Sequence, residues 1–234
     1  MTSIKHISRI AGTLIILGMI AGILSIVPSV EGESYLKEVY PNKNQVLSGA
    51  LFQFLLVPIY IGFSLVIYPV LRDFSRPLSI GFVGFRFVAG AFQLVGLILL
   101  PAFILISQKY TSDSGSNIVL YETIGEMLKL LRDLINHLGV MVATGLGGLI
   151  LYALFFMGKQ IPRWLSVWGI AGNTLLLVAS FLLLFQLLDV VSIGYGMMTI
   201  PVVLQEIVFA IWLLTKGLCW PLKDQNLEYE VTRD

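Results

Sequence analysis

Six long apolar runs dominate this chain and leave few alternatives for its fold. They cover about residues 10–28, 49–71, 78–107, 134–158, 164–188 and 198–215. A helix of about 20 residues crosses the hydrocarbon core of a bilayer, and a spanning segment must satisfy its own backbone polar groups. A transmembrane β-barrel would show alternating segments of about ten residues instead. The sequence therefore predicts an all-α polytopic membrane protein, a bundle of about six transmembrane helices in one domain covering residues 1–234.

The composition excludes several classes of protein. Charged residues make up 12% of the 234 residues, against about 25% in soluble domains. The formal net charge is +1 and no basic stripe occurs, so nucleic acid is not an expected partner. With one cysteine, Cys219, and two histidines, the chain has no internal disulfide and too few ligands for a zinc site without several carboxylates. We expect no cofactor and no metal, and the lipid bilayer is the expected partner.

The distribution of lysine and arginine predicts the orientation, because cytoplasmic loops of membrane proteins are enriched in both. The shortest loops between spans, residues 72–76 and 159–163, are both basic. The basic side holds Lys5, Arg9, Arg72, Arg76, Lys159, Arg163, Lys216, Lys223 and Arg233. We therefore predict a multi-pass protein of the cell membrane with both termini in the cytoplasm.

Residues 121–133 are more polar than the spans and allow two interpretations. Glu122 and Glu126 are i,i+4 neighbours on a helix, as are Lys129 and Asp133. The pattern is typical of an amphipathic helix lying in the outer interface before the fourth span. A long fourth span that extends into water has the same pattern.

Polar residues inside the spans are the first candidates for function, because ionisable groups at membrane depth are unfavourable unless paired. Arg86 lies about 12 Å from the inner end of its helix, Glu206 about 15 Å and Asn173 about 13 Å, at 1.5 Å per residue. Gln93 shares with Arg86 a helix face of small and polar residues. We predict that Arg86 and Glu206 meet inside the bundle with Asn173 close by. Such a group forms either a pair that fixes helix register or a headgroup, ion or proton site.

A second polar group lies toward the outer side. Asn136 and His137 open the fourth span, and Gln186 and Asp189 close the fifth. These residues are either solvated at the interface or part of a site. Since histidine titrates near neutrality, His137 with Asp189 would form a pH-sensitive pair.

Several short motifs carry a family resemblance. They are Ser8-Arg9-Ile10-Ala11-Gly12, Phe85-Arg86, Ile161-Pro162-Arg163-Trp164-Leu165, and the stretch from Pro201 to Gly217 with Gln205-Glu206 and Ala210-Ile211-Trp212-Leu213-Leu214-Thr215-Lys216-Gly217. The chain resembles, over nearly its whole length, the bacterial family called domain of unknown function 4386. The resemblance implies a multi-helix bacterial membrane protein of unassigned activity and supplies no catalytic residues. In that family an acidic residue often follows the Phe-Arg pair by about a turn, where this chain has Ala89.

Three classes of function stay open. The first is binding or transport of a small or lipid-like ligand between the helices. The second is a non-catalytic interaction protein, such as an immunity, stress or assembly factor. The third is an unrecognised enzyme acting on lipid. The sequence has no Gly-x-Ser-x-Gly elbow, no His-Glu-x-x-His pair and no phosphate-binding loop, so we assign no catalytic residue.

Overall fold

The computed structural model describes residues 4–219, and the regular elements of this part of the chain are all helices. They are α1 (Ile4–Leu24), α2 (Pro28–Glu31), α3 (Tyr35–Glu38), α4 (Lys43–Leu71), α5 (Arg76–Ser112), α6 (Ile118–Asp133), the π-helix η1 (Leu134–Val140), α7 (Met141–Gly158), α8 (Arg163–Leu184) and α9 (Ile193–Thr215). Six helices are long and apolar enough to span a membrane, with α6, η1 and α7 forming one continuous helix. The prediction of an all-α bundle with six spans is confirmed.

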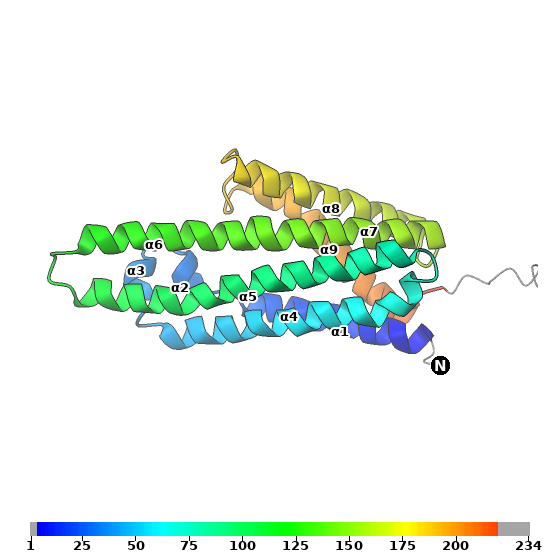
Figure 1. Cartoon of the computed structure of the whole chain (residues 1–234), viewed down its shortest axis with the longest axis horizontal. Coiled ribbons are helices and arrows are strands. Elements are labelled where there is room, and N and C mark those ends of the chain that lie inside the picture. Colours follow the sequence, from blue (N-terminus) through cyan, green and yellow to red (C-terminus); the bar gives the residue numbers. More distant parts are fainter. Residues whose placement is uncertain (1–3, 220–234) are drawn as a thin grey trace, which may run out of the picture.

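The six helices differ in length, and the difference shapes the molecule. Helices α1, α8 and α9 have 21, 22 and 23 residues. Each is therefore about 32–35 Å long, close to the ~30 Å hydrocarbon core. Helix α5 has 37 residues and the continuous helix Ile118–Gly158 has 41, so α5 and α6 extend well past α8 and α9 (Figure 1). Residues 121–133 are collinear with the fourth span, as in the second interpretation of this segment.

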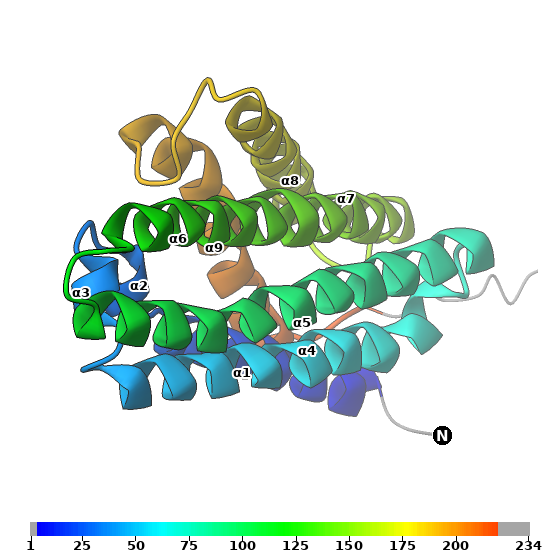
Figure 2. The same ribbon diagram turned by 60° about the vertical axis from the view of Figure 1, so that its left-hand side comes forward.

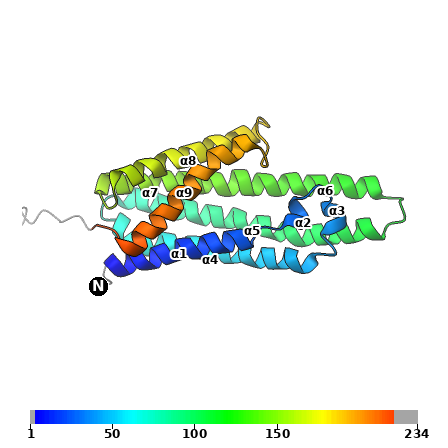
Figure 3. The same ribbon diagram turned by 180° about the vertical axis from the view of Figure 1, so that it is seen from behind.

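The long helices close into a ring. In chain order α1 packs on α4, α4 on α5, α5 on α7, α7 on α8 and α8 on α9, and α9 returns to α1. Figure 3 shows α9 running obliquely from the α8 end toward the start of α1, and Figure 2 shows the connection between α8 and α9 standing away from α5 and α4. Large buried side chains fill the ring, among them Phe82, Leu151, Phe155, Leu165, Phe209 and Leu213. The centre of this ring is where the membrane-buried polar residues must find their partners.

Both described ends of the chain lie at one end of the bundle. The backbone N–H of Leu218 donates to Ser8 Oγ at 3.0 Å. The backbone N–H of Cys219 donates to the carbonyl of Gln160, in the loop between α7 and α8, at 2.9 Å. The predicted basic side of the chain is this end of the bundle, although Lys223 and Arg233 lie outside the described residues. That this side is cytoplasmic stays a prediction.

The opposite end carries a small cap, which we define as residues 28–38 with α2 and α3. It packs on a hydrophobic cluster formed with α4 and α5 that includes Val30, Leu36 and Phe103. Ser107 Oγ donates to the Leu36 carbonyl at 2.8 Å and accepts from the Tyr40 backbone N–H at 2.9 Å. The cap is therefore tied to the projecting part of α5.

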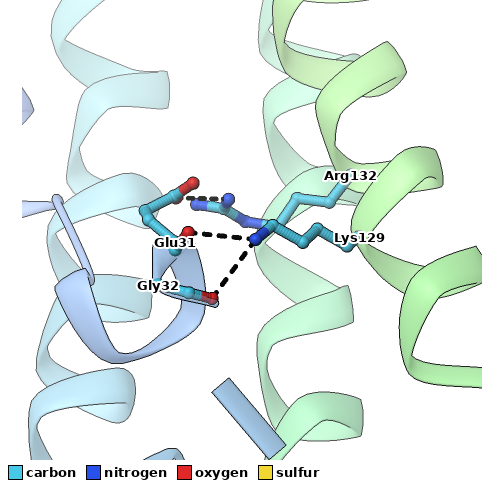
Figure 4. A network of polar contacts seen from close by, with 4 residues as sticks. All are labelled: Glu31, Gly32, Lys129 and Arg132. Carbon is cyan, nitrogen blue, oxygen red and sulfur yellow. Dashed lines mark hydrogen bonds and ion pairs between the residues drawn. The ribbon is translucent and has the colours of Figure 1, made fainter. Parts of the chain in front are cut away.

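A charged latch ties the same cap to α6 (Figure 4). Arg132 Nη1 donates to Glu31 Oε1 at 2.6 Å, and Lys129 Nζ donates to the carbonyls of Glu31 and Gly32 at 3.0 and 3.3 Å. The Arg132 side chain is 6% exposed, whereas that of Glu31 is 43% exposed. The arginine is buried and its partner is not. Removing one partner should therefore destabilise the protein more than for an exposed ion pair and less than for a fully buried one.

Replacing Glu31 by alanine is expected to loosen the cap without unfolding the bundle. The change leaves the buried Arg132 guanidinium without its carboxylate, which corresponds to about 1–2 kcal/mol for a half-exposed charged hydrogen bond. Backbone amides of residues 28–38 should then exchange with deuterium about tenfold faster. Glu38→Ala is the matched control, because the Glu38 side chain makes no hydrogen bond or ion pair within residues 4–219. Equal exchange in the two variants would show that the latch does not hold the cap.

The turn between α5 and α6 is organised by Asp113. Its carboxylate accepts hydrogen bonds from Asn117 Nδ2 at 3.0 Å and from the backbone N–H groups of Gly115 and Ser116 at 2.8 and 2.9 Å. These bonds, that of the Asn117 side chain first, lower the pKa of Asp113 to about 2. The lowered pKa means that these bonds stabilise the turn at neutral pH. Their contribution is lost as the pH falls below the ordinary aspartate value toward about 2.

Candidate functional site

Arg86 lies at the centre of the helix ring and is 6% exposed. Its guanidinium carbon is 5.6 Å from the ring centres of Tyr60 and Phe63 on α4 and of Phe82 on α5. A guanidinium at this distance is attracted to the negative faces of aromatic rings, more strongly where water is excluded. The arginine Nε has no hydrogen-bond partner within the described part of the chain. Aromatic faces therefore provide the immediate surroundings of this charge.

Glu206 of α9 and Arg86 line one small cavity. Its volume is about 20 Å³, and Ile15, Tyr60, Phe63, Leu151, Tyr152 and Phe209 complete its wall. No nitrogen–oxygen contact within 4.0 Å joins Arg86 to Glu206 among residues 4–219. A cavity needs about 10–15 Å³ to hold one water. The two side chains thus line the same space, which holds about one water molecule, and they form no direct ion pair within the described residues.

Gln93 lines a second small cavity on the other side of Arg86. This cavity is about 10 Å³ and is also bordered by Tyr60, Gly90 and Thr144. Gln93 and Arg86 therefore border the same small cavity. Together the two cavities give Arg86 room for about two waters, which is too little for an organic ligand.

Asn173 lies on α8 and is 3% exposed, but it lines neither cavity beside Arg86. Its Nδ2 donates to the Gly169 carbonyl one turn earlier at 2.7 Å. Its amide also packs against Gly148 of α7, where any side chain would collide with it. Asn173 therefore forms its hydrogen bond within its own helix and packs against α7, so its contacts are those of helix packing.

The outer polar group is built around the π-helix η1. His137 Nδ1 lies 2.8 Å from the hydroxyl of Tyr195, and that hydroxyl lies 2.8 Å from Met141 Sδ. Asn136 Oδ1 is buried without a hydrogen-bond partner in the described chain and lies beside Gly96 of α5. Single π-turns within α-helices are frequent at functional sites.

Asp189 forms no ion pair with His137 within the described residues, so the pH-sensitive pair is not formed. It is exposed in the loop between α8 and α9, where its carbonyl accepts from the Ser192 backbone and hydroxyl at 3.0 and 2.6 Å. Tyr195 stands 4% exposed in the first turn of α9 and takes the place beside His137. A tyrosine among apolar residues gave no signal of this role in the sequence.

A larger groove runs beside the π-helix on the outside of the ring. Its volume is about 520 Å³, and all its lining residues are apolar. The floor is formed by η1 and α7, one wall by α5 and the other by α8. The lining residues are Phe85, Val88, Phe92, Leu134, Ile135, Leu138, Gly139, Val142, Ala143, Leu146, Phe181 and Leu184. The ring of Phe92 fills the space above Gly139, where any side chain would collide with it.

The splay of the helices explains where this groove lies. Helix α8 starts close to the end of α7 and diverges from it toward the projecting end of the molecule (Figure 1). Phe181 and Leu184, in the last turn of α8, stand on the diverging part. The groove therefore widens where α8 leaves α7, at the level of the π-helix.

The comparisons with known proteins give a family and nothing closer. Residues 10–217 match the family described as Domain of unknown function (DUF4386). No curated protein and no solved structure matches the chain.

Proposed function

We propose that this chain, which belongs to the DUF4386 family, is a membrane protein that binds the hydrocarbon tail of a lipid-like amphiphile in the groove between α5, η1, α7 and α8. The observation that carries the proposal is the groove itself. Its 520 Å³ falls within the range of about 300–1,000 Å³ that small-molecule sites occupy. We also place the protein in the cell membrane with both termini cytoplasmic, because the basic residues gather at the end of the bundle where both described chain ends lie.

The lining of the groove favours a hydrocarbon occupant. No lining side chain carries a hydrogen-bonding group. A polar group buried there without a partner would be unfavourable by several kcal/mol, so the part of the ligand inside must be apolar. The groove also faces outward from a helix ring that spans the bilayer, so lipid tails reach it directly.

The buried polar cluster is a weaker candidate for a ligand site. The cavities next to Arg86 measure about 20 and 10 Å³, each enough for about one water. Arg86 and Glu206 are enclosed by five of the six ring helices, because α1, α4, α5, α7 and α9 all line the shared cavity. This closure favours a role in fixing how the helices pack over a role in binding substrate.

Filling the groove with a large side chain should displace its ligand. Val88→Trp puts an indole into the groove from the α5 wall, whereas Val203→Trp puts one on the lipid-facing side of α9 outside it. The two valines are 46% and 47% exposed, so the variants are matched in surroundings. We expect photo-crosslinking of a diazirine-tailed phospholipid, in detergent, to fall about tenfold in Val88→Trp, equivalent to about 1.4 kcal/mol. Crosslinking to Val203→Trp should stay at the wild-type level.

The same experiment tests the competing occupant, a helix of another protein. Crosslinked peptides from the wild type should map to residues 85–92, 134–146 and 181–184. Labelling spread evenly over all lipid-facing helices would contradict a specific site. Loss of a co-purified protein from Val88→Trp, with lipid labelling unchanged, would assign the groove to a helix and support the interaction class of function instead.

A further inference from the structure

The floor of the apolar groove runs straight along one helix for a defined length. Its residues on η1 and α7 recur at intervals of four positions, as Leu134, Leu138, Val142 and Leu146 do. Residues four apart lie on the same face of a helix, so these side chains form a nearly straight strip along the axis. The strip is about 18 Å long at 1.5 Å per residue. The groove therefore offers contacts to a linear chain of about that length.

The inner end of the groove is closed, because α7 packs directly against both walls there. Leu146 is the innermost lining residue of α7 and stands among glycines. A methyl group at Gly145 would lie 3.0 Å from the Leu177 side chain of α8. A methyl group at Gly147 would lie 3.3 Å from Cβ of Phe85 on α5. Both walls thus reach the α7 backbone beside Leu146, and the groove ends at this level.

The outer end of the groove, toward the cap, is open because the α8 wall stops there. Leu184 is the last residue of α8 and also the outermost lining residue of that helix. The next three residues, Phe185, Gln186 and Leu187, are exposed. Helix α8 also diverges from α7 toward this end (Figure 1). An amphiphile in the groove therefore has its polar end at the outer end, beside the connection between α8 and α9.

The depth of the groove matches one half of the membrane. Helix α7 ends at Gly158, at the same end of the bundle as both described chain ends. Measured from Gly158 at 1.5 Å per residue, Leu146 lies at about 18 Å and Leu134 at about 36 Å along the axis. The hydrocarbon core is about 30 Å thick, so its midplane lies about 15 Å from its edge. The groove therefore begins near the midplane and rises to the interface on the cap side, as the tail of a lipid in that leaflet does.

We propose that the groove selects a straight acyl chain of about 15 carbons from the leaflet on the cap side, with the chain end at Leu146 and the headgroup beside the α8–α9 connection. This inference rests on the proposed function and adds the length of the chain and the direction in which it lies. An extended peptide backbone advances about 3.6 Å over three bonds, so an extended hydrocarbon chain advances about 1.2 Å per bond and reaches about 18 Å with about 15 carbons. A shorter chain leaves part of the lining without contacts, and a longer chain must bend or move its headgroup away from the open end.

Two photoprobes test the direction of the chain in the wild-type protein. Both are palmitoyl lysophosphatidylcholine, one with a diazirine at the end of the chain and the other with a diazirine next to the headgroup. We expect the first probe to crosslink to residues 142–146 and the second to residues 134–138 and 181–184. Peptide mapping by mass spectrometry distinguishes these segments.

Competition against the first photoprobe in detergent tests the chain length. Myristoyl and palmitoyl lysophosphatidylcholine should displace the probe at the lowest concentrations. The decanoyl and arachidoyl lipids should need about threefold more, because micelles also bury the chains and only the contacts inside the groove differ. Leu146→Trp fills the inner end and removes about 6 Å of groove, so the optimum should become about five carbons shorter. Val203→Trp, on the lipid-facing side of α9, should keep the wild-type optimum.

The outcomes separate this inference from the proposed function. Groove labelling with a reversed or uniform pattern, or displacement that does not depend on chain length, would overturn the inferred length and direction and leave the groove as a lipid site. An unchanged optimum in folded Leu146→Trp would overturn the closed inner end in the same way. Labelling spread evenly over all lipid-facing helices would overturn the proposed function, and this inference with it.

Discussion

Arg86→Ala is expected to lower the free energy of unfolding by about 3–5 kcal/mol, and the double variant Arg86→Ala/Glu206→Ala by less than the sum of the two single changes. Arg86 is buried against three aromatic rings and shares a cavity with Glu206. Removing the arginine leaves the carboxylate without a compensating charge, and removing both leaves no buried charge. Unfolding midpoints in detergent, followed by tryptophan fluorescence, measure all three variants.

Arg163→Ala is the control for the aromatic contact alone. The Arg163 guanidinium carbon lies 5.7 Å from the Phe156 ring centre, nearly the distance found at Arg86, but Arg163 is exposed. Its removal should change stability by about 1 kcal/mol or less. If Arg86→Ala is no worse than Arg163→Ala, burial adds nothing to the role of Arg86. If the two single changes are additive, Arg86 and Glu206 do not interact across their cavity.

Gly169→Ala is expected to destabilise the bundle by about 1–3 kcal/mol, the usual effect of overpacking a core. A methyl group at Gly169 on α8 would lie 2.5 Å from Cδ2 and 2.6 Å from Cδ1 of Tyr152 on α7. The tyrosine is 3% exposed and has little freedom to retreat, because Phe155 and Phe209 pack around it at ring-centre distances of 6.2 and 5.7 Å. The cavity beyond the ring, about 20 Å³, is too small to receive it.

Gly84→Ala should have the opposite sign. Gly84 of α5 is exposed, and a methyl group there would meet nothing within 4 Å. Alanine favours the helix over glycine by about 0.8–1.0 kcal/mol, so the unfolding midpoint should stay the same or rise. A fall of similar size in both variants would mean that glycine serves helix flexibility, and not close packing, at Gly169.

The sequence predicted the class of fold because the membrane restricts the alternatives so strongly. A run of about 20 apolar residues crosses the bilayer as an α-helix, because a helix satisfies its own backbone hydrogen bonds. The six long helices coincide with the six apolar runs. Helix ends were less predictable. Helix α5 continues to Ser112 and α4 begins at Lys43, because polar residues past the bilayer keep the helix going in water. The apolar pattern indicates which residues lie in the hydrocarbon core, but it does not indicate where a helix begins or ends.

Depth along a helix was readable in the sequence, but direction around it was not. Counting residues placed Arg86 and Glu206 at one level, and they line one cavity. The same count gave Asn173 the same level, yet its side chain bonds back to Gly169. The partner of His137 is 58 residues away and depends on a π-turn that no residue pattern indicated. Contacts of this kind follow from how the ring closes, which no single segment encodes.

Cavities were the least predictable features. Glu122 and Glu126 line a surface cavity together with Glu33 and Tyr35, about 90 residues earlier in the chain, but the sequence showed the two glutamates only as neighbours on one helix face. The apolar groove is defined by the spacing of α5, α8 and the continuous helix that contains η1 and α7. A void between distant elements leaves no mark in composition or periodicity.

The length of the continuous helix Ile118–Gly158 determines which medium surrounds the start of α6. Glu122 lies 36 residues from Gly158, about 54 Å along the axis, whereas the hydrocarbon core takes about 30 Å. Glu122 thus stands about 20 Å beyond the hydrocarbon edge. The field of charged headgroups decays with a Debye length of about 8 Å at physiological salt. Changes in lipid charge are attenuated severalfold before they reach Glu122, so this end of α6 responds mainly to the composition of the surrounding solution.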